Sequence, residues 1–323
     1  MLTSLFRSKT ILGLFLTYVL SGLLVGVVWY LAPNTGSVSE LLSTHWAFAW
    51  AEQLATLIPI IGIVLASGAA LLGRVRFREI KETLGSRNLS TLAFASIIAS
   101  QHKPLLARPD LIAASLVLIA VFMLIFFTYK KDSALSEIFH VGLGVGLASL
   151  FVGQSILLVI SVAFSLLMLR TGSMKEWIVF LLGLGMTAIF ISLVVVWTED
   201  PVLSFKRVIQ SAWIAQVSVS SLSIGNLVLL VLIALSFTTV LSNITAGTVH
   251  LRNISLVNLG WVAGVVLTIV ILGVDWQAGL VLAAFPISQF ISKLIESINR
   301  WWIADILLLL LIAAPILSIL LPL

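Results

Sequence analysis

The chain has 323 residues, of which 60% are hydrophobic and only 10% are charged. A soluble globular domain typically carries about 25% charged residues, so the surface of this chain would be too apolar for water. There are no cysteines, which excludes disulfides, thiolate nucleophiles and thiolate metal sites. The net charge is +5 without a basic stripe or a base-stacking pattern, so we expect no nucleic-acid partner and assign the excess to cytoplasmic loops.

The apolar runs are nearly continuous, as in residues 60–72 and 306–323. Strands of a membrane barrel alternate apolar and polar residues, so these runs favour helices that satisfy their own backbone groups. The apolar run over residues 10–32 is too long for a signal peptide and predicts a retained first helix. The pattern predicts an all-α transmembrane bundle, a single integral membrane domain over residues 1–323.

Eleven segments could be membrane helices, since a span needs about 20 apolar residues and fewer where neighbouring helices shield its ends. They cover residues 10–32, 54–73, 88–101, 111–129, 137–152, 154–170, 175–198, 223–242, 255–273, 277–291 and 302–321. The third, fifth and tenth are short, which is typical of tilted, broken or re-entrant helices. The pattern is therefore compatible with nine to twelve spans.

The distribution of basic residues predicts the orientation. With the N-terminus inside, 14 of the 18 Lys and Arg residues fall in cytoplasmic segments. The other side holds only Lys103, Arg108, Lys206 and Arg207. Because Lys and Arg concentrate in cytoplasmic loops, we expect the N-terminus inside and, with an odd number of spans, the C-terminus outside.

The first predicted outer loop, residues 33–53, carries Glu40, His45 and Glu52 but no Lys or Arg. A carboxylate in such a loop could act as a general base toward an acceptor hydroxyl. We therefore expect Glu40 or Glu52 to be catalytic if the protein is a transferase, with His45 among the substrate-binding residues.

A second predicted outer segment, residues 198–222, begins with TEDP and continues with apolar residues at helical spacing. This pattern predicts an interfacial helix on the outer face, carrying Lys206 and Arg207. Together with Lys103, these cations could hold the phosphate leaving group of a lipid-phosphate donor. An ordinary scatter of loop charges would explain the same residues.

Sequence motifs of soluble enzymes are absent from the chain. It has no GxxxxGK, GxGxxG, HExxH or GxSxG motif, and its four histidines are scattered over both predicted faces. We therefore expect no metal site and no cofactor. Without an ATP motor, any energy must come from an activated substrate, a gradient or a partner.

Few polar residues fall within the predicted spans. Asp305 lies about one turn into the last span, and Gln154 and Asn226 lie near the outer ends of theirs. Glycine-rich runs at residues 142–149 and 183–185 could be helix breaks of a transporter. Close helix packing through small residues is the favoured explanation of both runs.

The stretch over residues 136–200 resembles the core of the GT-C class of multi-pass glycosyltransferases. In that class a glycine-rich helix pair, roughly G-x-x-x-G-x-A-x-L, is followed by a span, a basic turn and a span ending outside. The matching residues are Gly142, Gly146, Ala148 and Leu150 in the helix pair and Arg170 and Lys175 in the turn.

The chain as a whole resembles a family of uncharacterised multi-pass membrane proteins of Bacteroidetes. The likeness rests on the start MLTSLFRSK, residues 88–91, the GLASLF element at residues 146–151 and a last helix with Pro315. The two resemblances imply a GT-C-like protein of the bacterial inner membrane that handles polyprenyl-phosphate-linked sugars in envelope glycan biogenesis. The alternative is a non-catalytic membrane subunit or transporter of a cell-envelope complex; the partners would be membrane lipid and the lipid-linked donor.

The predicted orientation can be tested with reporter fusions placed after Arg76 and after Glu40. The two positions are separated by one predicted span, so the reporters should lie on opposite sides of the membrane. Alkaline phosphatase and fluorescent-protein fusions report the two sides. Identical sidedness at both positions would contradict the predicted topology.

Overall fold

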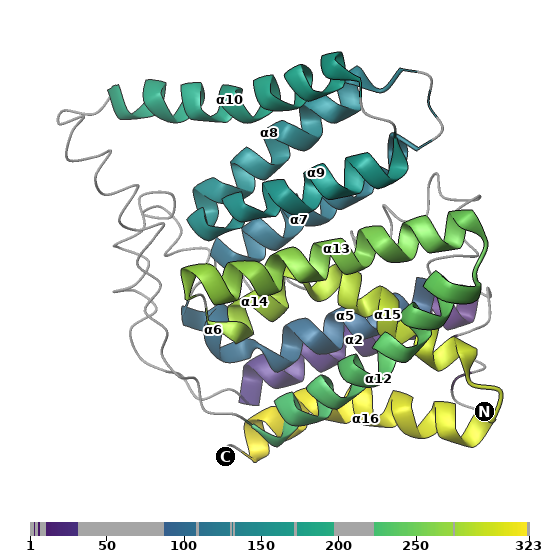
Figure 1. Ribbon diagram of the computed structural model, residues 1–323. Coiled ribbons are helices and arrows are strands. Elements are labelled where there is room, and N and C mark those ends of the chain that lie inside the picture. The colour runs from purple at the N-terminus through teal and green to yellow at the C-terminus, as the bar shows by residue number, and fades with distance from the viewer. Residues whose placement is uncertain are drawn as a thin grey trace.

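The computed structural model describes Thr3, Phe6 and residues 11–31, 87–107, 110–129, 131, 133–170, 173–196, 223–273 and 275–321. Of these residues, 91% are helical and none lies in a strand, so the all-α prediction is confirmed for this part of the chain. The helices lie side by side in a bundle, seen in Figure 1 with their axes mostly across the picture.

The helices of the described residues are, in chain order, α2 (Ile11–Leu31), α5 (Arg87–Ser100), α6 (His102–Ala107), α7 (Asp110–Phe127), α8 (Leu135–Phe151), the 3₁₀ helix η2 (Gly153–Leu157), α9 (Leu158–Leu169), α10 (Met174–Val196), α12 (Ile224–Ala246), α13 (Val249–Leu272), α14 (Trp276–Leu282), α15 (Ala284–Ser297) and α16 (Trp301–Leu320). Ten of the eleven predicted spans correspond to these helices. The predicted span 54–73 and the predicted interfacial helix in residues 198–222 lie outside the described residues.

Four of these helices are long and apolar enough to cross a membrane: α7, α12, α13 over Leu251–Leu272, and α16. The bent pair of α14 and α15 makes a fifth if it is counted as one span. Large apolar side chains are exposed along the periphery, for example Phe190 on α10 and Val270 on α13, and lipid suits such a surface. The chain therefore has the helices of a membrane protein, while the predicted number of eleven spans and the orientation stay predictions.

Helix α5 lies at the centre of the bundle. All its described side chains, from residue 88 to residue 100, are buried, and it packs against α2, α12, α15 and α16. At about 1.5 Å per residue it is shorter than a membrane of about 30 Å. A short helix is tolerated at this place because other helices, not lipid, surround it.

One arginine joins four helices at one end of the bundle. The Arg170 guanidinium, just after α9, donates to the carbonyl oxygens of Thr128 and Lys131 after α7, both at 2.8 Å. It also forms an ion pair of 2.8 Å with Glu176 on α10. Lys131 in turn pairs with Glu137 on α8. The end of α7, the start of α8, the end of α9 and the start of α10 therefore meet here.

The other helices can be assigned to the same two ends. The start of α13 joins this end, since Asn253 donates to the Met168 carbonyl at the end of α9. At the far end, α12 begins where α16 finishes, because the Ile224 amide donates to the Leu321 carbonyl. We call the end around Arg170 the basic end, because the seven described Lys and Arg residues that the sequence assigns to the cytoplasm all lie near it: Arg87, Lys131, Arg170, Lys175, Arg252, Lys293 and Arg300.

The glycine-rich runs are explained by close packing of α8 on α10. A Cβ atom on Gly142 would collide with the backbone carbonyl of Phe180, and one on Gly183 with that of Phe139. The two helices therefore approach through reciprocal glycines, as small residues allow in membrane bundles. The break in the helix comes after the first run, at Val152, where α8 ends and η2 begins.

Two glycines on one helix make a matched test of this packing. Gly183→Ala should destabilise the protein by about 1–3 kcal/mol, because backbone atoms of α8 must move to admit the methyl group. Gly185→Ala has open space around the new methyl group and should be neutral or stabilising by up to about 1 kcal/mol. Thermal unfolding of the purified protein in detergent measures both, and equal melting temperatures would contradict the packing.

Candidate functional site

Of the predicted site residues, only Lys103 lies in the part of the chain that the structure describes, and its role stays a prediction. Glu40, His45, Glu52, Lys206 and Arg207 lie outside the described residues, so their convergence on one cavity stays a prediction. Lys103 lies on the short helix α6, at the end of the bundle opposite to the basic end. The residues that the structure does bring together at that end are mostly uncharged.

A cluster of buried amides and hydroxyls joins the end of α5 to the start of α12. Gln101 occupies the turn between α5 and α6, and its Nε2 donates to Asn226 Oδ1 at 3.0 Å and to Ser100 Oγ at 2.9 Å. The backbone N–H of Asn226 donates to the Oγ of Ser223, the N-cap residue of α12. We call Ser100, Gln101, Ser223 and Asn226 the amide cluster. The hydrogen bond between Gln101 and Asn226 links two helices that lie far apart in the sequence. The amide cluster therefore fixes the register of α5 against α12.

Other polar side chains are buried at the same end of the bundle. His102 begins α6, Asp110 begins α7 and Gln277 lies in the first turn of α14, and each is at most 3% exposed. Asp275 caps α14 by accepting a hydrogen bond from the Gln277 amide at 3.2 Å. Among the described residues, no group of three or more His, Asp or Glu side chains is arranged to hold a metal ion. Hydrogen bonding is the interaction that Asp275 shows here.

The helix pair α14–α15 is bent by 75° at Ala283. The seven residues of α14 start at the end that holds the amide cluster, and α15 continues toward the basic end. The Ala283 amide donates to the Gly279 carbonyl at 3.0 Å, which closes the last turn of α14. Interrupted backbone at membrane depth is tolerated only where protein or a water-filled cavity surrounds it, and the side chains around this bend are buried.

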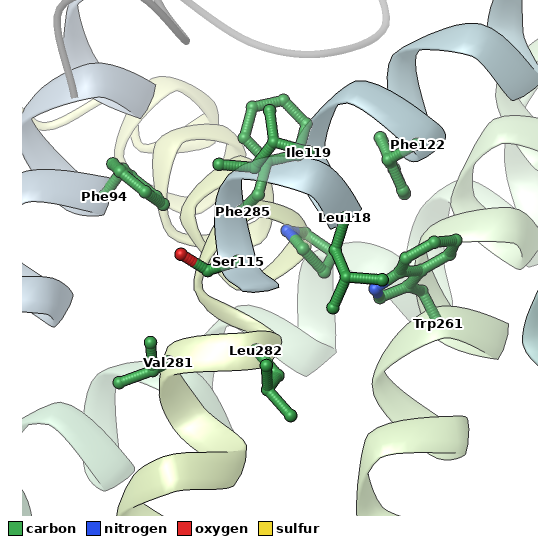
Figure 2. A pocket seen from close by; sticks show the side chains of 10 residues that line it. Phe94, Ser115, Leu118, Ile119, Phe122, Trp261, Val281, Leu282 and Phe285 are labelled. Carbon is green, nitrogen blue, oxygen red and sulfur yellow. The ribbon is translucent and has the colours of Figure 1, made fainter. Parts of the chain in front are cut away.

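An aromatic cluster packs against the bend, as Figure 2 shows. The Phe122 ring meets Trp261 edge-on, with centroids 5.3 Å apart, and Phe285 at 5.2 Å. Together with Leu282 and Pro286 these rings surround a space that is too small for a water molecule. The aromatic cluster is therefore a packed plug between α7, α13 and α15 rather than a binding cavity.

Beyond the plug, polar side chains continue between α5 and α15. Gln289 Nε2 on α15 donates to Ser90 Oγ on α5 at 2.8 Å, and Ser96 of α5 donates to the Leu311 carbonyl of α16. Ser288 and Ser292 are fully buried on α15. We call Ser90, Ser288, Gln289 and Ser292 the hydroxyl seam, whereas Ser96 bonds to α16. The seam places uncharged hydrogen-bonding groups on α5 and on the buried α15.

Sequence reasoning found part of this site. Asn226 stood out as a polar residue inside an apolar run, and the structure shows it buried in the amide cluster. Gln101 was expected only as the last residue of a short span; the polar pair Ser100–Gln101 beside His102 was the available signal. The hydroxyl seam was missed, because serine on a membrane helix is also common at ordinary helix contacts.

Comparison with protein-family models, with curated proteins and with solved structures finds no match for this chain.

Proposed function

We propose that the protein is a membrane transporter that carries a polar, uncharged solute between α5 and the bent pair α14–α15. The bend carries this proposal. Substrate sites of secondary transporters form at interrupted helices inside the bundle, where freed backbone groups and nearby polar side chains can bind a solute. Here α14 starts at the end of the bundle that holds the amide cluster, α15 carries part of the hydroxyl seam, and Phe285 of the aromatic cluster follows the bend.

The chemistry of the side chains supports a neutral solute. Amides and hydroxyls both donate and accept hydrogen bonds, which suits the hydroxyl groups of a sugar or polyol. A charged solute would need an opposite charge to offset its desolvation in the bundle. The hydroxyl seam contains no charged side chain, and Asp110 is the first residue of α7 and not part of the seam.

The packed aromatic cluster then corresponds to a closed state. A solute passing from the amide cluster to the hydroxyl seam must displace the contact of Phe122 with Phe285, because the space between them admits no water. The bend at Ala283 lies two residues before Phe285 and provides a place where α14 and α15 can change their angle. Minor open states of proteins are typically populated at about 0.1–10%.

The absence of native cysteines makes the route testable by cysteine labelling. A single cysteine at Ser288, in membranes, should react with a small water-soluble thiosulfonate at about 0.1–10% of the rate of an exposed cysteine, through the open state. Ser288 is fully buried in the closed state. Arg300→Cys supplies the exposed reference and Ala148→Cys, fully buried in α8 away from the seam, supplies the unreactive control. Equal inertness of Ser288→Cys and Ala148→Cys would overturn the transport route.

The second candidate function is transfer of a sugar from a polyprenyl-phosphate donor in envelope glycan biogenesis. Its support from the described residues is that α6 carries Lys103 next to the buried His102, at the end of the bundle that the sequence assigns to the outside. A phosphate there would need such a cation. In this proposal Glu40 or Glu52 is the base, and Lys103, Lys206 or Arg207 holds the phosphate.

The transferase can be tested at its proposed base. Glu40→Gln and Glu52→Gln, singly and together, should slow envelope glycan assembly by about 10²–10⁴-fold if one of them is the general base. Glu296→Gln, at the basic end and in an ion pair with Lys293, is the matched control and should leave assembly unchanged. Unchanged envelope glycan assembly in the double variant would contradict the transferase function and leave the transporter function as the proposal.

A further inference from the structure

Two residues near the start of the chain are buried at the basic end of the bundle. Thr3 is 3% exposed and Phe6 is 1% exposed, and Phe6 belongs to the main hydrophobic core. The backbone N–H and the Oγ hydroxyl of Thr3 both donate to Asp305 Oδ1, at 2.7 Å and 2.8 Å. We call Thr3 and Phe6 the N-terminal anchor. The anchor joins the start of the chain to the first turns of α16.

The anchor lies at the depth where the hydroxyl seam approaches the basic end. Helices α5 and α16 run in the same direction from this end, because both finish beside the start of α12. Ser96 of α5 bonds the Leu311 carbonyl of α16. Six residues before these two partners lie Ser90 and Asp305, which are therefore at about the same depth, since both helices rise about 1.5 Å per residue. Ser90 belongs to the hydroxyl seam, so the anchor binds α16 at the level of the seam.

The same part of the seam is closed in the structure. Helix α15 packs against both α5 and α16, and Ser292, the residue of the seam nearest the basic end on α15, is fully buried. Alternating access requires that each side of a solute route can be closed and opened in turn. The hydrogen bonds of the anchor to α16 end on one carboxylate, so the anchor can detach while α5, α15 and α16 keep their own backbone hydrogen bonds.

We propose that the N-terminal anchor is the gate at the basic end of the solute route. The seam is closed to water at this end while Thr3 is bound to Asp305, and it opens when Thr3 leaves. The proposal rests on the proposed transport function and names the gate that this function needs. Hydrogen bonds to an ionised carboxylate are stronger than neutral ones and favour the closed state. Weakening them therefore shifts the population toward the open gate.

Cysteine labelling in membranes tests the gate. Thr3→Val keeps the shape of the side chain and removes the hydroxyl that donates to Asp305. In this background a single cysteine at Ser292 should react with a small water-soluble thiosulfonate about 10–100-fold faster than in the Ser292→Cys protein alone, because one hydrogen bond to a charged group shifts an equilibrium by about that factor. Asp305→Asn, which leaves a neutral acceptor, should raise the rate in the same direction.

Two controls separate the gate from general loosening. Thr17→Val removes a hydroxyl that is also buried but bonds the Gly13 carbonyl within α2, and it should leave the rate at Ser292→Cys unchanged. A cysteine at Ile138, which is buried on α8 at the basic end, should stay unreactive in the Thr3→Val background.

The outcomes distinguish the gate from the route. No increase at Ser292→Cys in either Thr3→Val or Asp305→Asn would overturn the gate, and so would an equal increase with Thr17→Val. If Ser288→Cys reacts in the otherwise unaltered protein while the gate variants have no effect, the solute route stands without this gate. If the gate variants expose Ser292→Cys while Ser288→Cys stays as inert as Ala148→Cys, the gate is supported and the route beyond it is contradicted.

Discussion

In a membrane, every backbone amide and carbonyl must find its partner within the protein, and the architecture of this bundle follows from that constraint. Long apolar helices such as α12 and α16 satisfy their own backbone and can face lipid. The interrupted elements, η2 and the bend at Ala283, are instead enclosed by other helices and buried. Breaks in the helices therefore mark the interior of the bundle, and the proposed solute route passes the break at Ala283.

The sequence predicted the helical segments well, because a long apolar run in a membrane must form a helix that satisfies its own backbone hydrogen-bonding groups. Of the three short runs expected to be tilted, broken or re-entrant, 277–291 is the bent pair α14–α15, whereas 88–101 and 137–152 form the continuous helices α5 and α8. The bend at Ala283 lies three residues before Pro286. Proline has no backbone N–H, so the Leu282 carbonyl loses its helical partner there, and this residue was a signal for the interruption that the sequence reasoning did not use.

The buried polar residues were predictable only in part. Gln154 and Asn226 were visible as polar residues within apolar runs, whereas their surroundings depend on helices more than 70 residues away, such as α13 and α5. The charges of the outer loops suggested chemistry at the surface, while the described structure places uncharged hydrogen-bonding groups in the interior.

The burial of α5 has a consequence for biosynthesis. Helices α15 and α16, which pack against it, are made roughly 200–220 residues later, and at about 5–20 residues per second they emerge about 10–45 s afterwards. During that interval Ser90 and Ser96 of α5 lack Gln289 and the Leu311 carbonyl as partners. The nascent chain therefore holds an incompletely paired helix until its last two helices arrive, and these two helices complete the assembly.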